Sequence, residues 1–213
     1  AQVIRGAALT GGRVEGKAGL ASAFASMITL SMGGSAGREG PVVHLGAVLS
    51  SKVSRWLNAD AITGRNLMGC AAAAAVSASF NAPIAGTLFA LEVVLRHYAV
   101  QAFAPIVIAS VAGSIVSRLV FGDFVEFALP EMSLQFYSEL PAFLLLGLVC
   151  GLVAVTMMKS IFLAEDVGDK LQEKLKISAW LRPAIAGAGL GMIALAFPHI
   201  IGVGYETTWN ALN

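Results

Sequence analysis

The residues with the clearest capacity for chemistry are the adjacent Arg38 and Glu39, in the segment GGSAGREGPVVHLG at residues 33–46. They are the only charged side chains between Ala18 and Ser51. Glycines surround them, so the backbone there is free to turn sharply and to approach a ligand closely. Pro41 follows, and a proline suits the first turn of a helix, where its missing N–H costs no hydrogen bond. The segment therefore predicts a break in the chain followed by a new helix.

A helix that begins inside a membrane would favour an anion at its first turn. Its first N–H groups have no intrahelical partner, and the helix dipole adds about half a positive charge there. With no water nearby, these donors attract an anion, which can leave again because no full opposing charge holds it. The Glu39 carboxylate is itself an anion, so it can fill the site until a proton or an arriving anion displaces it. The pattern predicts a gate. Two alternatives stay open: an ion pair with Arg38, or a carboxylate that stabilises the helix start by about 0.3–1 kcal/mol.

The composition indicates that the solvent of this chain is lipid. Only 13% of the 213 residues are charged and 57% are hydrophobic, whereas a soluble domain usually has about a quarter charged residues. Five windows lack Asp, Glu, Lys and Arg, namely residues 18–37, 66–91, 97–117, 140–158 and 183–205. Each is close to the roughly 20 residues that cross the hydrocarbon core as a helix. We therefore expect an integral, multi-pass membrane protein, and the net charge of +1 offers no field that would attract nucleic acid.

Glycines, prolines and polar residues divide the chain into helices. Asp60 or Thr63 can cap a helix that runs through the alanine-rich stretch to a break at FNAP. There we expect Asn81 to cap the helix that begins near Pro83. The full set of expected helices is 19–32, 42–57, 68–79, 84–97, 102–119, 141–176 and 181–197, of which 42–57 is too short to span in its uncharged part.

Charge and small residues give the orientation and the packing. The loop between the last two long helices is basic and the loop at 122–139 is acidic, which places the first in the cytoplasm and the second outside. Small residues, as in AIAGAGLG at 184–191, let helix backbones approach closely in lipid. Short helices broken at Gly or Pro are typical of a transport site. The basic residues are Lys159, Lys170, Lys174, Lys176 and Arg182.

Two motifs resemble those of one family. GREGP at Gly37–Pro41, preceded by GGSA and followed by an apolar helix, resembles the second anion-filter segment of the CLC chloride channels and transporters. FNAPIAGTLFALE at Phe80–Glu92 is similar to the next signature of that family, at the expected distance. The resemblance implies an all-α membrane bundle of tilted and broken helices with inverted repeats, and one pore per subunit of a homodimer.

The resemblance also implies how residues 1–213 divide. They would form part of a CLC membrane domain, with the end of the first repeat at about 1–121 and the start of the second at about 139–213. Segments 84–97 and 102–119 would contribute to the dimer interface. The protein would lie in the cell (inner) membrane, with lipid and chloride as its partners.

By the same resemblance Glu39 is the gating glutamate. Gly37, Arg38, Glu39, Gly40 and Pro41 take the filter positions whose backbone N–H groups face the anion. Two further filter elements of the family, a Gly-Ser-Gly-Ile-Pro type and a Gly-Xaa-Phe-Xaa-Pro type, are not found in the sequence. We therefore expect the chain to come from a longer protein and not to conduct alone.

The resemblance favours a passive chloride channel, gated by voltage or pH. Proton-exchanging members typically have two successive glutamates after the apolar run, and here the pair is Glu92–Val93. Valine carries no proton, so a proton-coupled chloride antiporter is the alternative, and a simpler role for Glu92 is a cytoplasmic helix end facing Arg96. A fluoride transporter is more remote. So is an intramembrane enzyme, because Glu39 has no second carboxylate, Ser-His pair or metal cluster at workable spacing. No cofactor is expected.

The remaining polar residues predict structural roles. His44, His97 and His199 are scattered without metal-ligand spacing, so we expect satisfied or interfacial histidines. Cys70 and Cys150 lie in apolar windows and are expected to be small buried hydrophobic residues without a disulfide.

Three residues near the proposed gate have alternatives of their own. Arg38 either adds positive potential at the pore mouth or bonds carbonyl groups at the broken helix end. Ser35 is expected to bond its own backbone in the turn. Tyr205 is expected to be an interfacial anchor rather than an ion ligand.

Overall fold

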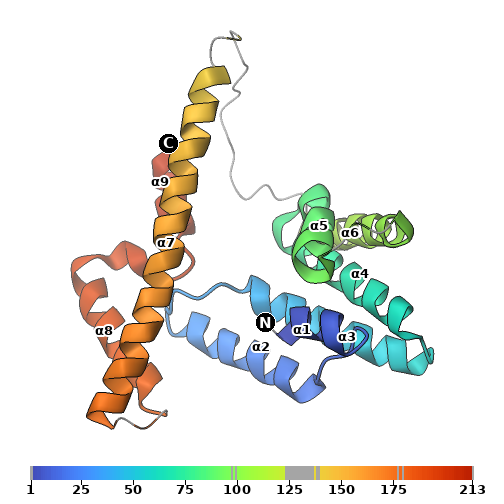
Figure 1. Ribbon diagram of the computed structural model, residues 1–213. Helices are drawn as coiled ribbons and strands as arrows, with labels where there is room; N and C mark the ends of the chain where they lie inside the picture. The colour runs from blue at the N-terminus through green and yellow to red at the C-terminus, as the bar shows by residue number, and fades with distance from the viewer. Residues whose placement is uncertain are drawn as a thin grey trace. The chain divides into compact units, whose positions relative to one another are not determined.

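The computed structural model describes residues 2–96, 98, 100–122, 137, 140–176, 178 and 180–212 (Figure 1). All regular structure in these residues is helical, which confirms the predicted all-α class. The elements are α1 (Gln2–Leu9), α2 (Gly16–Ser31), α3 (Glu39–Trp56), α4 (Ala61–Phe80), α5 (Pro83–Phe89), η1 (Ala90–Leu95), α6 (Val100–Phe121), α7 (Leu140–Leu175), α8 (Arg182–Ala196), η3 (Pro198–Ile200) and α9 (Tyr205–Leu212). The predicted inverted repeats at 1–121 and 139–213 stay a prediction.

Local sequence rules place the starts of α3 and α4 correctly. Pro41 lies in the first turn of α3, which begins at Glu39. Asp60 is the N-cap of α4, and its side chain accepts a hydrogen bond from the backbone N–H of Thr63 at 3.2 Å. Of the two expected caps, Asp60 is therefore the one the helix uses.

We predict that Asp60→Ala destabilises the protein by removing this cap, with a fall in Tm of about 2–4 °C. Hydrogen bonds from the Thr63 side chain, and then from its backbone, lower the pKa of the Asp60 carboxyl. The contribution of the carboxylate is present above its unfolded pKa and is lost as the pH falls through the lowered folded pKa. Thermal unfolding in detergent at pH 7 and at acidic pH measures it. Asp60→Asn is the control, because asparagine caps without titrating; an Asp60→Asn protein as unstable as Asp60→Ala at pH 7 would contradict the cap.

The break after α4 is built differently from the prediction. Asn81 has left-handed φ and ψ of 52° and 35° and ends α4, while Pro83 is the first residue of α5. The prediction that Asn81 caps α5 is wrong, because Ala82 holds that position without a side-chain bond. The Asn81 Oδ1 instead accepts hydrogen bonds from Ser114 Oγ and Arg118 Nε of α6, both at 2.8 Å. The amide therefore ties the break to α6.

The helix expected over 84–97 changes type along its length. α5 passes into η1, a π-helical segment, which ends at Arg96 with a φ of 58°. Glu92 and Val93 lie on η1 and are exposed. Among the described contacts no ion pair joins Glu92 to Arg96, and the role of Glu92 as a cytoplasmic helix end stays a prediction. Because Arg96 has a left-handed backbone conformation, its side chain does not point in the direction that a continuing regular helix would give it.

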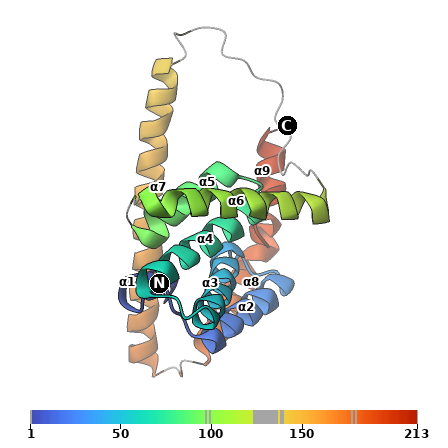
Figure 2. The same ribbon diagram turned by 90° about the vertical axis from the view of Figure 1, so that its right-hand side faces the viewer.

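Two compact units make up the chain, Ala1–Ala128 with Ile200–Ala211, and Leu129–His199. In the first unit α4 packs most extensively against α6 and α3, and Figure 2 shows it between them. The unit has one apolar cluster, with residues from α1, α3, α4, η1 and α6. Its fully or nearly buried members are Ala7, Val43, Ala47, Met68, Ala72, Ala73, Val76, Ala90, Leu91, Val94, Leu95, Ala102 and Ile106.

Small residues bring the helices of the first unit together, as predicted. A Cβ added to Gly86 would stand 2.7 Å from the carbonyl oxygen of Ala73, and one added to Gly113 would stand 2.6 Å from that of Ala74. The predicted stretch at 184–191 behaves differently, because none of its glycines has a neighbouring atom within 4 Å of an added Cβ. Glycines thus let α4 approach α5 and α6 closely, and they also bring the segment after α1 against the start of α4, where a Cβ added to Gly12 would stand 2.2 Å from the carbonyl oxygen of Gly64.

In the second unit, α7 is one long helix with an apolar first half and a charged tail, as predicted. Of the described helices, α6 and α7 are long and apolar enough to cross a membrane. α8 confirms a helix at the expected place, but its 15 residues extend only about 22 Å. That is less than a perpendicular span requires. The acidic loop at 122–139 falls mostly outside the described residues, so the orientation stays a prediction.

Candidate functional site

The segment that precedes α3 is a tight, glycine-dependent turn. Gly33 has a φ of 81°, a left-handed conformation that glycine adopts without strain. The N–H of Gly34 donates to the carbonyl of Thr29 at 2.9 Å, and the N–H of Ala36 donates to the carbonyl of Gly34 at 3.0 Å. The chain thus leaves α2, turns and starts α3 at Glu39 within eight residues of Ser31.

The start of α3 presents unused backbone donors. Arg38 is the N-cap and its side chain makes no capping hydrogen bond. The N–H of Val42 donates to the carbonyl of Arg38 at 3.2 Å. Pro41 has no amide hydrogen, so the expectation that its N–H faces the anion is wrong. The N–H groups of Glu39 and Gly40 therefore lie in the first turn, where no intrahelical acceptor exists and the helix dipole is positive.

The Glu39 side chain folds back over the turn that precedes its own helix. A Cβ added to Gly37 would stand 2.5 Å from Glu39 Oε2, so the carboxylate occupies the space that a side chain at position 37 would need. A Cβ added to Gly40 would meet no atom within 4 Å. The negative group therefore lies at the helix start, on the side of Gly37, where the dipole attracts an anion.

Arg38 has a partner that sequence reasoning missed. Its Nη2 donates to the Tyr205 hydroxyl at 3.0 Å, and its Cζ lies 5.7 Å from the centre of the Tyr205 ring. The contact gives Tyr205 a cationic partner where an interfacial anchor was expected, and the two roles expected for Arg38 stay predictions. The two residues are 167 positions apart, so no local pattern links them.

Ser35 also departs from its expected role. Its hydroxyl donates to the backbone carbonyl of Ile200 and not to its own turn. The prediction was wrong because the segment around residue 200 supplies an acceptor next to the turn, a contact over 165 positions.

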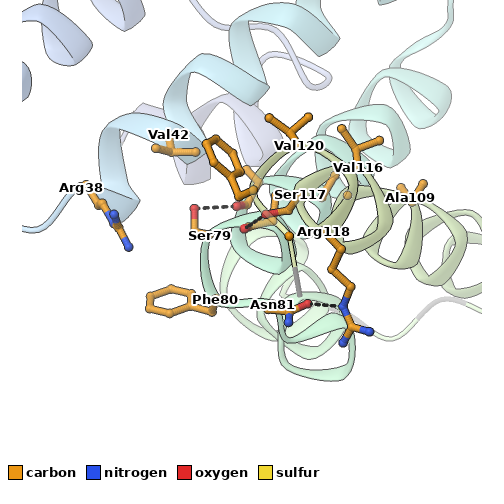
Figure 3. A pocket seen from close by; sticks show the side chains of 17 residues that line it. Arg38, Val42, Ser79, Phe80, Asn81, Ala109, Val116, Ser117, Arg118 and Val120 are labelled. Atoms are coloured by element: carbon orange, nitrogen blue, oxygen red, sulfur yellow. Dashed lines mark hydrogen bonds between the residues drawn. The ribbon is translucent and has the colours of Figure 1, made fainter. Parts of the chain in front are cut away.

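A hollow of about 1280 Å³ lies between α4, α6 and the start of α3. Figure 3 shows Arg38 beside it at the start of α3, and Arg118 of α6 bonded to Asn81. The hollow thus brings the GREGP and FNAP motifs together, through Arg38 from the first and Phe80 and Asn81 from the second. Its lining residues, all of them described, include no Asp or Glu; they are Arg38, Val42, Ala74, Ala75, Ala78, Ser79, Phe80, Asn81, Ala109, Ala112, Gly113, Val116, Ser117, Arg118, Val120, Phe121 and Gly122.

The two described histidines, His44 and His199, are not among the residues that line the hollow. His44 is buried in α3, where an added Cβ at Gly19 of α2 would lie 3.5 Å from its Cδ2. Its Nε2 has no hydrogen-bond partner within the described part of the chain, so of the two expected roles, satisfied or interfacial, the first is not found. His199 lies on η3, and His97 lies outside the described residues.

The cysteines are free thiols on separate helices. Cys70 is half-buried in α4 and packs against the apolar cluster, close to the expected small hydrophobic role. Cys150 is exposed on α7, so the expected burial is wrong for it in this unit. An exposed small apolar residue on a spanning helix is compatible with a lipid-facing surface.

Comparison with known proteins identifies the class. The chain matches the family model described as "Voltage gated chloride channel" over residues 1–213. It is 31% identical over 190 residues to the chloride channel protein CLC-e of Arabidopsis thaliana. The matched residues cover 85% of this chain and 27% of CLC-e. It is 32% identical over 196 residues to CLC-f of the same plant, with coverage of 90% and 25%.

A bacterial relative is named as an exchange transporter rather than as a channel. The H(+)/Cl(-) exchange transporter ClcA of Vibrio cholerae is 31% identical over 186 residues, which cover 85% of this chain and 39% of that protein. No solved structure matches the chain significantly. The chain spans between about a quarter and two fifths of the length of these three relatives. It belongs to the voltage-gated chloride channel family, as its two motifs predicted, and it is part of a membrane protein.

Proposed function

We propose that the complete protein moves chloride across the membrane as a passive channel, with Glu39 as its gate. The observation that carries the proposal is the Glu39 carboxylate folded over Gly37 at the start of α3. Membership of the family and the names of the plant relatives support chloride as the permeant ion.

The proposed mechanism is a competition for one position. The N–H groups of Glu39 and Gly40 and the α3 dipole attract a halide, and Gly37, without a side chain, leaves the space in which the carboxylate rests. Pro41 has no N–H and contributes the fixed φ that starts the helix. Arg38 adds positive charge beside the position. When a proton neutralises the carboxylate, or an arriving anion takes its place, the side chain leaves and the path opens.

A proton-coupled antiporter is the second candidate, because a relative named as an exchange transporter is 31% identical to the chain. Val93 favours the channel, since valine cannot accept a proton where exchangers have a glutamate. It lies exposed on η1, next to Glu92.

We predict that a chloride gradient drives no protons uphill through the complete protein. The measurement uses sealed proteoliposomes with an external pH electrode and a chloride gradient, and the control is vesicles without protein. A channel dissipates chloride with no proton movement beyond the control. Proton uptake in fixed ratio to chloride would replace the channel with the antiporter and leave the role of Glu39 in place.

The complete protein is proposed to be a homodimer in the cell membrane, with the basic residues of 159–182 in the cytoplasm. Support for the interface comes from the exposed apolar residues of α6, among them Phe103, Ile108 and Ile115. Such a face must meet either lipid or another protein surface.

A further inference from the structure

Residues 200–205, here called the strap, lie against the turn that precedes Glu39. The hydroxyl of Ser35 donates to the carbonyl of Ile200, and the N–H of Gly202 donates to the carbonyl of Gly33 at 3.2 Å. A Cβ added to Gly33 would stand 3.0 Å from Cγ2 of Ile201, so the Ile201 side chain packs closely against the Gly33 backbone. Both segments belong to the first compact unit.

The strap ends on the charged residue next to the gate. Tyr205 accepts the hydrogen bond from Arg38 Nη2 at 3.0 Å and offers its ring to the guanidinium at 5.7 Å. Two different interactions, one with the hydroxyl and one with the ring face, thus fix the same guanidinium. Arg38 is flexible by itself, because a long side chain has about 2 kcal/mol of rotamer freedom.

A tyrosine is suited to hold a charge that must stay effective. A carboxylate in the same place would fix the guanidinium and also cancel its charge. The phenol is neutral, so it determines where the positive charge lies without removing it. Ser35 and Gly33 hold the strap in register with the turn, so the position of Tyr205 follows the position of the backbone before Glu39.

We propose that Tyr205 is a positioning residue for the anion site: it places the Arg38 guanidinium beside the start of α3, so that the strap sets the anion affinity of the Glu39 position. The inference rests on the proposed function and extends it to a residue 167 positions from Arg38.

The test is Tyr205→Phe in the complete protein, which removes the hydroxyl and retains the ring. The initial rate of chloride flux into proteoliposomes is measured against chloride concentration. If the charge retreats from about 6 to about 10 Å from the anion, the chloride KM rises by about 2-fold at an effective dielectric constant of about 80, and by about 6-fold at about 20. The maximal rate stays unchanged, because Tyr205 does not touch the anion. Tyr98→Phe is the matched control, an exposed tyrosine outside the strap, and it leaves the KM unchanged.

The double variant separates positioning from a general structural role. Because Tyr205 acts through Arg38, Arg38→Gln/Tyr205→Phe has the KM of Arg38→Gln alone. A wild-type KM in Tyr205→Phe, or effects of the two changes that multiply, overturns the proposal. The Tm values of the same four proteins measure the Arg38–Tyr205 contact independently of transport, and additive changes in Tm would also overturn it. Failure of the proposed function itself would be visible elsewhere, as a flux that does not respond to changes at Glu39.

Discussion

Glu39→Gln raises chloride flux at neutral pH by about 2-fold to about 30-fold, the range given by a carboxylate that a helix start stabilises by about 0.3–2 kcal/mol. Glutamine has nearly the shape of the protonated side chain and no negative charge. The variant therefore has permanently the uncharged side chain that protonation would give the wild-type glutamate. Its flux becomes nearly independent of pH, whereas the wild-type flux rises as the pH falls. Efflux of chloride from liposomes, measured from pH 8 to pH 5, checks both effects.

Gly37→Ala is a second way to disturb the same carboxylate without changing its charge. The added methyl group would stand 2.5 Å from Glu39 Oε2, and because that atom ends a flexible side chain, the carboxylate moves and the fold does not. We expect a flux between those of wild type and Glu39→Gln, with the pH dependence retained. Gly147→Ala in α7 is the matched control, since a Cβ there meets no atom within 4 Å and the residue is not a filter position.

Two outcomes would contradict the gate. One is a Glu39→Gln protein with the flux and the pH response of wild type. The other is a Gly37→Ala protein with the same flux as Gly147→Ala, because only the methyl group at position 37 would displace the Glu39 carboxylate.

Gly113→Ala is expected to destabilise the protein by about 1–3 kcal/mol through overpacking. The added Cβ would stand 2.6 Å from the carbonyl oxygen of Ala74 and 2.9 Å from its Cα. Both atoms belong to the backbone of α4, so no side chain can move aside and the two helices must separate. α4 with α6 is the most extensive helix contact in the first unit. The Tm of the complete protein in detergent, with the fraction that elutes as a single species, measures the loss.

Gly151→Ala is the matched control for Gly113→Ala. It is the same substitution inside α7, where an added Cβ meets no atom within 4 Å. Alanine favours a helix over glycine by about 0.5–1 kcal/mol, so we expect an unchanged or slightly raised Tm. If both variants lose the same stability, the cause is not the contact between α4 and α6.

The sequence predicted well what local rules determine. Pro41 and Asp60 mark the starts of α3 and α4 because proline geometry and side-chain capping act within a few residues. Freedom from charge marked the apolar segments, since lipid excludes charge along a whole span. The chemistry proposed for Glu39 followed from one helix start and one carboxylate.

What escaped prediction depends on contacts between distant segments. Asn81 was expected to serve the helix beside it, yet its amide accepts from two donors more than 30 positions away. Ser35 and Tyr205 likewise have partners more than 160 positions away. Such donors and acceptors bond to whichever polar group the fold brings near them. The spacing of residues along the sequence does not predict which group that is.

The π-helical segment η1 affects the comparison of Val93 with the aligned residue of a relative, because it changes the direction in which the side chain points. A regular α-helix turns by about 100° per residue, so one extra residue accommodated in a widened turn rotates everything after it by about that angle. Val93 therefore presents its side chain in a direction that depends on where the bulge lies. Suppose that two homologues have the same sequence after FNAP but only one of them contains the wide turn. Different side chains then face the same neighbouring residue in the two proteins. The orientation of a residue around the helix axis, more than its place in the sequence, therefore determines which neighbour its side chain faces.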